Sequence, residues 1–217
     1  MVALTERIYD LAPPGGLFDE TVVGNLLPDH APGARNAMVH RAARKGEILI
    51  LKPGLYCLAE KYRRTHPHPF IVAAMLHAPS HISLESALSY HGLIPEAVHQ
   101  VASVTSQRSR TFNTPLGYFT YRRVPCDYTR AGVVAEKVVD NAWAFLATPL
   151  RAIADLIYVR RDVRWEKDGL AFLTTSMRID MDDLHDVSMD LFDEVHDSFR
   201  NKRVKDYLRG VKETVGT

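Results

Sequence analysis

Residues 32–58 read PGARNAMVHRAARKGEILILKPGLYCL, a basic helical pattern followed by two short apolar runs. Pro32 suits the first turn of a helix that extends to about Lys45. On a helical wheel, Met38, Val39 and Ala42 share the side that faces the core. The opposite side carries Asn36, Ala37, His40, Arg41 and Arg44.

A β-hairpin is predicted directly after this helix. Ile48–Leu51 and Leu55–Leu58 are short apolar strands, and Pro53-Gly54 occupies the two central positions of a type II turn. Lys52 and Tyr56 are therefore expected near the tip of the hairpin.

The preceding residues predict two shorter helices. Leu4, Ile8 and Leu11 recur at helical spacing and mark the first helix. Asp19 can cap the second, which Pro28 ends. The second helix is expected to bury Val22, Val23, Leu26 and Leu27.

Two helices, a basic helix and a hairpin follow one another in the order of a winged helix-turn-helix, a DNA-binding module. Asn and Arg side chains can pair with base edges, while Arg and Lys neutralise phosphates. Winged helices also bind proteins, and an isolated basic helix can simply be solvated, so both alternatives stay open. The predicted DNA-contacting residues are Arg35, Asn36, His40, Arg41, Arg44, Lys45, Lys52 and Tyr56.

The charge of the chain is segregated, although its formal net charge is only +1. Between Asp29 and Arg64 there are eight basic side chains and three acidic ones. Residues 180–197 contain eight acidic side chains and no Lys or Arg. A basic front on a nearly neutral chain is compatible with nucleic-acid binding by one module only.

A polar, proline-punctuated segment, Glu60–Pro69, divides the chain. We predict a winged helix-turn-helix domain over residues 1–62 and a C-terminal domain over residues 63–217. The expected fold class is α+β, in which the N-terminal module precedes a larger domain of helices packed on an antiparallel sheet.

The C-terminal domain mixes helical and strand patterns. Sequential strands with short turns, one of them at Asp140-Asn141, imply the antiparallel sheet. Ser83 and Thr148 can each cap a helix. Helices are expected over 70–76, 84–91, 149–157, 184–199 and 204–211, and strands over 100–105, 117–124, 132–138 and 142–147.

Basic and aromatic residues gather in a hairpin pattern over residues 108–123. Exposed rings can stack on bases and Arg can hold phosphates, so this segment is a candidate second nucleic-acid surface. We favour the simpler interpretation, in which the rings face the core and the arginines are solvated. The candidate residues are Arg108, Arg110, Tyr121, Arg122 and Arg123.

The run SHISLESALSYHGLIPE, residues 80–96, resembles the signature of AbiEi-type antitoxins of bacterial type IV toxin-antitoxin systems. The similarity continues through VTS at 104–106, TPLGYFTY at 114–121, ATP at 147–149 and Asp155, and includes the KPGLY hairpin at 52–56. The sequence departs from the family at Leu150-Arg151, where members often carry an acidic residue followed by a basic one.

The resemblance implies a two-part function. The N-terminal domain would bind repeats, which we expect to be inverted, in the promoter of its own operon and repress it. The C-terminal domain would counter a nucleotidyltransferase toxin, with or without direct contact, and the 108–123 surface is the candidate for this role. The alternative is a winged-helix regulator whose C-terminal domain senses a ligand or dimerises.

The sequence contains no nucleophile motif, Walker loop or zinc-ligand spacing, so we expect a non-enzymatic protein without cofactor or metal. The nearest approach to a nuclease site, Glu136-Lys137, is interpreted as a surface ion pair. Cys57 and Cys126 have no redox spacing, and the first residues lack the pattern of a signal peptide, which fits a reducing cytoplasm. No membrane partner is expected, because the apolar runs are short or interrupted.

Overall fold

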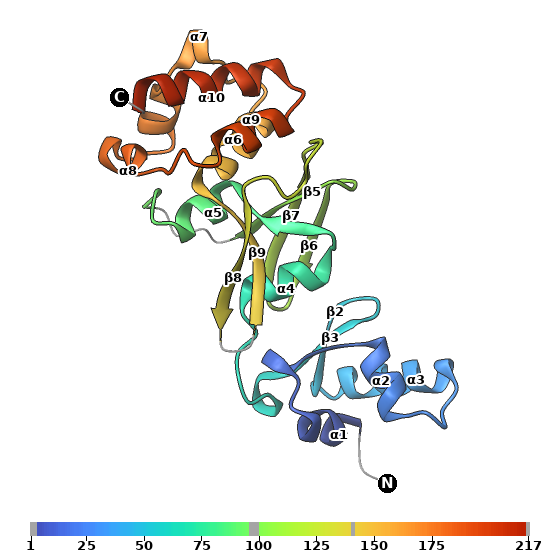
Figure 1. Cartoon of the computed structure of the whole chain (residues 1–217). Helices are drawn as coiled ribbons and strands as arrows, with labels where there is room; N and C mark the ends of the chain where they lie inside the picture. Colours follow the sequence, from blue (N-terminus) through green and yellow to red (C-terminus); the bar gives the residue numbers. More distant parts are fainter. Residues whose placement is uncertain (1–3, 96–99, 140–141, 216–217) are drawn as a thin grey trace.

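The computed structural model describes residues 4–95, 100–139 and 142–215, which form two lobes of mixed α+β structure (Figure 1). The N-terminal lobe, residues 4–62, carries three helices and a small sheet, and ends in a 3-10 turn at Glu60–Tyr62. Its elements are α1 (Leu4–Leu11), a 3-10 turn (Pro14–Gly16), β1 (Leu17–Asp19), α2 (Glu20–Leu26), α3 (Pro32–Arg44), β2 (Ile48–Lys52) and β3 (Leu55–Leu58).

The three strands of this lobe form an antiparallel sheet in the order β1-β3-β2. The expected turn forms at Pro53-Gly54, where Gly54 has a φ of 81°, as the second central position of a type II turn requires. The sequence did not predict β1, which is only three residues long and pairs Leu17 with Cys57. Because β3 is the central strand, both of its faces are buried.

The C-terminal lobe begins with α4 and contains a larger sheet with helices packed against it. Its elements are α4 (Pro69–Leu76), β4 (Ser80–Ile82), α5 (Leu84–Tyr90), β5 (Gln100–Thr105), β6 (Arg110–Thr114), β7 (Gly117–Arg123), β8 (Val133–Val139), β9 (Ala142–Ala147), α6 (Pro149–Val159), α7 (Trp165–Asp168), a π-helical turn (Phe172–Ser176), α8 (Met181–His185), α9 (Phe192–Ser198) and α10 (Lys202–Val215).

The large sheet is mixed, with the strand order β6-β7-β5-β4-β9-β8, so the expectation of a purely antiparallel sheet is wrong. β5 runs parallel to β7, and β4 runs parallel to β9. The reason is that β6 reverses the chain between β5 and β7, and β7 then lies between β6 and β5. The strands predicted at 100–105 and 142–147 are confirmed with the same bounds, as β5 and β9.

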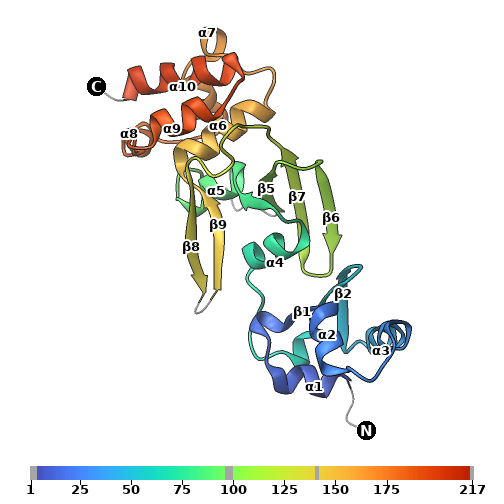
Figure 2. The same ribbon diagram turned by 45° about the vertical axis from the view of Figure 1, so that its right-hand side comes forward.

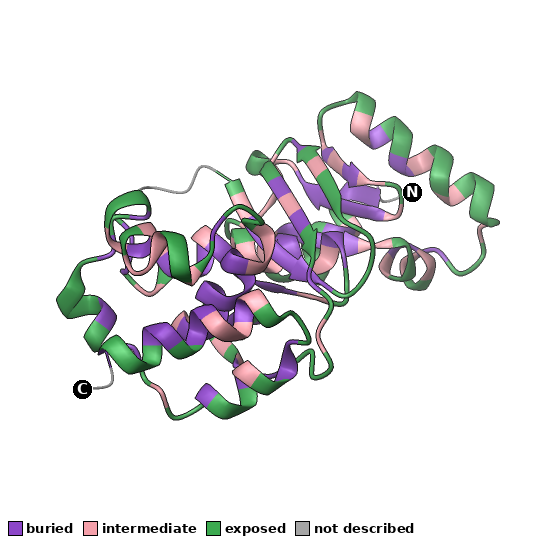
Figure 3. Ribbon diagram, turned by 90° about the horizontal axis from the view of Figure 1, so that it is seen from above, coloured by how far each residue is buried: buried purple, intermediate pink, exposed green. Residues whose placement is uncertain are grey.

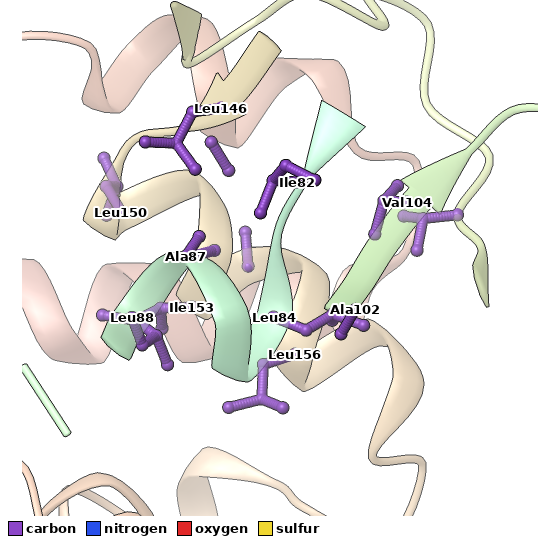
Figure 4. Close-up of a cluster of buried hydrophobic side chains, with 14 of the residues drawn as sticks. Ile82, Leu84, Ala87, Leu88, Ala102, Val104, Leu146, Leu150, Ile153 and Leu156 are labelled. Carbon is purple, nitrogen blue, oxygen red and sulfur yellow. The ribbon is translucent and has the colours of Figure 1, made fainter. Parts of the chain in front are cut away.

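The main core lies where α5 and α6 cover the sheet, as Figure 4 shows for a cluster of fully buried aliphatic side chains. α6 starts as expected, because the Thr148 side chain accepts a hydrogen bond from the Arg151 amide and Pro149 occupies the first turn. The labelled residues of this cluster are Ile82, Leu84, Ala87, Leu88, Ala102, Val104, Leu146, Leu150, Ile153 and Leu156.

The helix expected over 184–199 is instead two short helices, α8 and α9. Between them the Ser188 hydroxyl accepts a hydrogen bond from the Asp190 amide, a local turn that competes with helix formation. The last helix, α10, forms as expected. The turn at Asp140-Asn141 and Glu96 of the 80–96 run lie outside the described residues.

The two lobes meet where the β2–β3 hairpin approaches α4 and β6 (Figure 2). Leu51, Leu55 and Cys57 belong to the same apolar cluster as Val72 and Leu76 of α4. In both views α3 lies at one end of the molecule, while α8, α9 and α10 lie at the other. None of the helices in the described part of the chain has the length and apolar character needed to cross a bilayer.

Candidate nucleic-acid interface

α3 is anchored by one side and exposed along the other, as expected (Figure 3). Val39 and Ala42 are 1% and 6% exposed and pack against the N-terminal core with Met38. Arg44 is the last residue of the helix and Lys45 is its C-cap. Gly46 follows with a φ of 69°, the left-handed conformation typical of the residue after a helix end. Asn36, Ala37, His40, Arg41 and Arg44 are exposed.

The polar side chains of this outer face have no partners within the described part of the protein. Asn36, His40, Arg41, Arg44 and Lys45 make no side-chain hydrogen bond or ion pair with any described residue. Their donors are therefore satisfied by solvent and are available to an external acceptor. We refer to these five side chains as the α3 face.

Arg35 differs from its neighbours, because its guanidinium is used inside the protein. Its Nε donates to the carbonyl of Leu27 at 3.0 Å, and its Nη2 donates to the carbonyl of Pro28 at 3.1 Å. These bonds cap the end of α2 and hold the turn into α3. Arg35 is thus a positioning residue for α3, and because it is half-buried with N–H groups to spare, its contact with DNA stays a prediction.

The two hairpin residues predicted to contact DNA do not lie on an open tip. Lys52 Nζ donates to the carbonyls of Met75 and Leu76 at the end of α4, at 3.1 and 2.6 Å. Burial, together with the charge of Arg110, lowers the pKa of Lys52. Tyr56 is only 4% exposed, and its ring packs against Phe18 with 5.5 Å between ring centroids. Both assignments are corrected, because Lys52 donates to α4 of the C-terminal lobe and Tyr56 is buried in the core of the N-terminal lobe.

Lys52→Met gives an expected result that separates the two roles of this residue. The variant leaves two part-buried carbonyls without their donor and should lower the free energy of unfolding by roughly 1–3 kcal/mol. The salt dependence of DNA binding should not change, whereas Lys45→Met on the α3 face should reduce its log-log slope by about 0.9. Urea unfolding and fluorescence anisotropy measure the two quantities. If Lys52→Met reduced the log-log slope of DNA binding against salt, Lys52 would contact DNA after all.

A hollow of about 470 Å³ lies beside α3, between α2 and β3. Its wall includes the carboxylate-bearing Glu20 as well as Asn36 and Arg35. An acidic side chain repels phosphate, so this hollow does not extend the α3 face toward a nucleic acid.

The second basic segment is only partly exposed. Arg108, Arg110, Arg122 and Arg123 are exposed, in agreement with the interpretation of solvated arginines. Tyr121 is 1% exposed, and its hydroxyl donates to the carbonyl of Ala73 at 2.6 Å. Burial raises the pKa of Tyr121 well above its usual value. Tyr121 is therefore a core residue that joins β7 to α4, and its place in a binding surface is corrected.

A buried polar cluster in the C-terminal lobe was not anticipated as a unit from the sequence. Asp155 and Arg151 of α6 are both 0% exposed, and Arg151 Nε donates to Asp155 Oδ1 at 3.0 Å. Ser83 Oγ donates to Asp155 Oδ2 at 2.7 Å, and His81 Nε2 lies 3.3 Å from the same oxygen. The available signal was the i, i+4 spacing of Arg151 and Asp155.

This cluster corrects the role expected for Ser83, whose side chain does not cap α5. Its hydroxyl faces Asp155 instead, so the strand β4 is tied to α6. Burial by itself raises the pKa of Asp155, but Arg151, His81 and Ser83 outweigh it and leave the pKa below its usual value. The carboxylate is thus held ionised in the core by its neighbours.

No protein-family model matches the chain, and no curated protein matches it either.

Proposed function

We propose that this protein is a DNA-binding transcriptional repressor that contacts duplex DNA with the α3 face. The observation that carries the proposal is that this face holds three cationic side chains, Arg41, Arg44 and Lys45, together with Asn36 and His40. All five are exposed and have no partner among the residues that the structure describes. A helix of this chemistry can enter a major groove, where Arg and Asn read base edges and Lys neutralises phosphate.

The order of elements supports the same proposal. α1, α2 and α3 are followed by the β2–β3 hairpin, which is the order of a winged helix-turn-helix. The position of α3 at the end of the molecule leaves room for a duplex beside it. Because the hairpin packs on the C-terminal lobe, the proposed contacts come from α3 and its end rather than from a free wing.

Salt titration tests this proposal. Binding of a duplex that spans the promoter of the protein's own operon should weaken with salt, with a log-log slope of about 0.9 for each phosphate neutralised. Fluorescence anisotropy with the full chain measures the slope, and a scrambled duplex of equal length measures specificity. A flat salt response would favour a protein-binding role for the N-terminal lobe. Equal affinity for both duplexes would mean that the lobe binds DNA without sequence specificity, which contradicts a promoter-specific repressor.

We further propose, on the resemblance to AbiEi-type antitoxins, that the C-terminal lobe counters a nucleotidyltransferase toxin. The surface we assign to this role consists of the exposed arginines Arg108, Arg110, Arg122 and Arg123. Co-expression of the full chain with an adjacent nucleotidyltransferase gene should restore growth that the gene alone suppresses. If growth stays suppressed at confirmed expression of both proteins, the lobe has another function, and regulation through a ligand or a dimer becomes the better interpretation.

A further inference from the structure

A second hollow, of about 340 Å³, opens in the C-terminal lobe between the end of α4, the strands β4, β5 and β9, and the segment after β7. It lies away from the α3 face, in the other lobe of the molecule. Ligand sites in proteins have volumes from about 300 Å³ upward, so this hollow suits a molecule with a single ring.

The walls of the hollow are mainly apolar, and they include three basic side chains. Val104, Val124 and Phe145 supply apolar surface, whereas His81, Arg130 and Arg151 bring the basic groups. None of the described residues that line it is acidic. An apolar site with a few convergent polar groups is the usual character of a small-molecule site.

The two arginines contribute in different ways. Arg151 is 0% exposed, and three of its five N–H groups are assigned, to Asp155, to the Ala131 carbonyl at 2.7 Å and to Cys126 Sγ at 3.5 Å. Its charge is offset by Asp155. The guanidinium of Arg130 lies 5.6 Å from the centre of the Phe145 ring and has no acidic partner among the described residues. The uncompensated positive charge at the hollow is therefore that of Arg130.

We propose that this hollow binds a small aromatic carboxylate. The carboxylate would pair with the exposed Arg130 guanidinium, which matches carboxylate geometry through paired N–H donors. The ring of the ligand would lie against Phe145 and the valines of the wall, where apolar contact favours a flat, uncharged body. The proposal does not depend on DNA binding by α3.

The hollow also adjoins the junction between the lobes. Ala74 and Ala78 line it, and the carbonyls of Met75 and Leu76 between them accept the hydrogen bonds of Lys52. A ligand in the hollow would therefore contact the end of α4, to which Lys52 of the β2–β3 hairpin donates its hydrogen bonds.

Isothermal titration calorimetry of the full chain tests the proposal, with benzoate as the probe and benzamide as its neutral counterpart. Benzoate should bind, and benzamide should bind on the order of tenfold more weakly, because it lacks the charge that pairs with Arg130. Arg130→Gln should remove this preference, whereas Arg122→Gln, an exposed arginine outside the hollow, should retain it. Phe145→Ala should weaken both probes, and each replaced side chain is exposed enough for the variant to fold.

The absence of benzoate binding up to about 10 mM would overturn the proposal, since even a millimolar ligand is detected there. Equal affinities for benzoate and benzamide in the unmodified chain would also overturn it. So would a preference that survives Arg130→Gln. None of these results bears on DNA binding, which is measured separately with the promoter duplex.

Discussion

Replacing Arg41 and Arg44 together by alanine is expected to weaken binding to promoter DNA by on the order of 100-fold or more, because each lost contact with a base edge or phosphate costs about 1–3 kcal/mol. Both side chains are exposed on the outer side of α3 and have no internal partner in the described part of the protein. Anisotropy titrations at fixed salt with the promoter duplex measure the change.

The matched control is the pair Arg161→Ala and Arg209→Ala. These two arginines are exposed on the C-terminal lobe, and their loss changes the net charge by the same amount. The control should keep most of the affinity, since only local charge at the interface counts at physiological salt. Equal losses in the two double variants would mean that net charge, not the α3 face, determines binding.

The Arg41 and Arg44 variant also separates the two proposed activities. Both residues are surface residues, so the free energy of unfolding should fall by no more than about 1 kcal/mol, mainly from lost favourable charge at the helix end. Repression of a promoter reporter should be lost, while protection against the co-expressed toxin should remain. Loss of both activities in a folded variant would contradict a division of labour between the lobes.

Asp155→Ala is expected to lower the free energy of unfolding by on the order of 3–5 kcal/mol, because it leaves the buried Arg151 without its counter-ion. Ser83 and His81 lose their acceptor at the same time. Such a loss is a large part of the free energy of unfolding of a typical protein, which is about 5–15 kcal/mol. Urea unfolding followed by circular dichroism gives the value.

Two comparison variants test whether the unpaired charge of Arg151 causes the loss of stability in Asp155→Ala. Asp186→Ala, at an exposed aspartate, should change stability by less than about 0.5 kcal/mol. Arg151→Met combined with Asp155→Leu should be less destabilised than Asp155→Ala alone, since no unpaired charge remains in the core. If the double variant were the least stable of the three, the ion pair itself would be the stabilising element.

The pH dependence follows from the lowered pKa of Asp155. A carboxyl group whose pKa is lower in the folded state stabilises the fold above its unfolded pKa of about 4, and this contribution is lost as the pH falls through the folded value. The difference in unfolding free energy between the unmodified chain and Asp155→Ala should therefore narrow below about pH 4. If the difference in unfolding free energy stayed constant from about pH 4 down to about pH 2, this would contradict the assigned ionisation of Asp155.

Local signals in the sequence were sufficient where a helix or a turn depends on its own residues. The Pro32 start and the apolar side of α3 follow from periodicity, and the Pro53-Gly54 turn follows from the backbone preferences of these two residues. The Thr148 cap with Pro149 likewise placed the start of α6. In each of these cases the partner groups lie within a few residues along the chain.

Long-range contacts decided the rest. The parallel pairing of β5 with β7 depends on the insertion of one strand between two others, which no local pattern encodes. Ser83 faces Asp155 across 72 positions of the chain, and Lys52 reaches the carbonyl ends of α4 because the two lobes meet at that point. Side chains that the sequence predicted to be exposed or to cap a helix therefore donate hydrogen bonds to acceptors far away in the chain.

What the sequence determined by itself was the outward chemistry of α3, since the residues of one helix face are set by spacing alone. What only the tertiary structure decided was which of the other cationic and aromatic side chains remain exposed. Arg35, Lys52, Tyr56 and Tyr121 each satisfy a backbone carbonyl or a core contact inside the molecule. The physical reason is that buried carbonyls and apolar faces need partners, and folding selects those partners from any part of the chain.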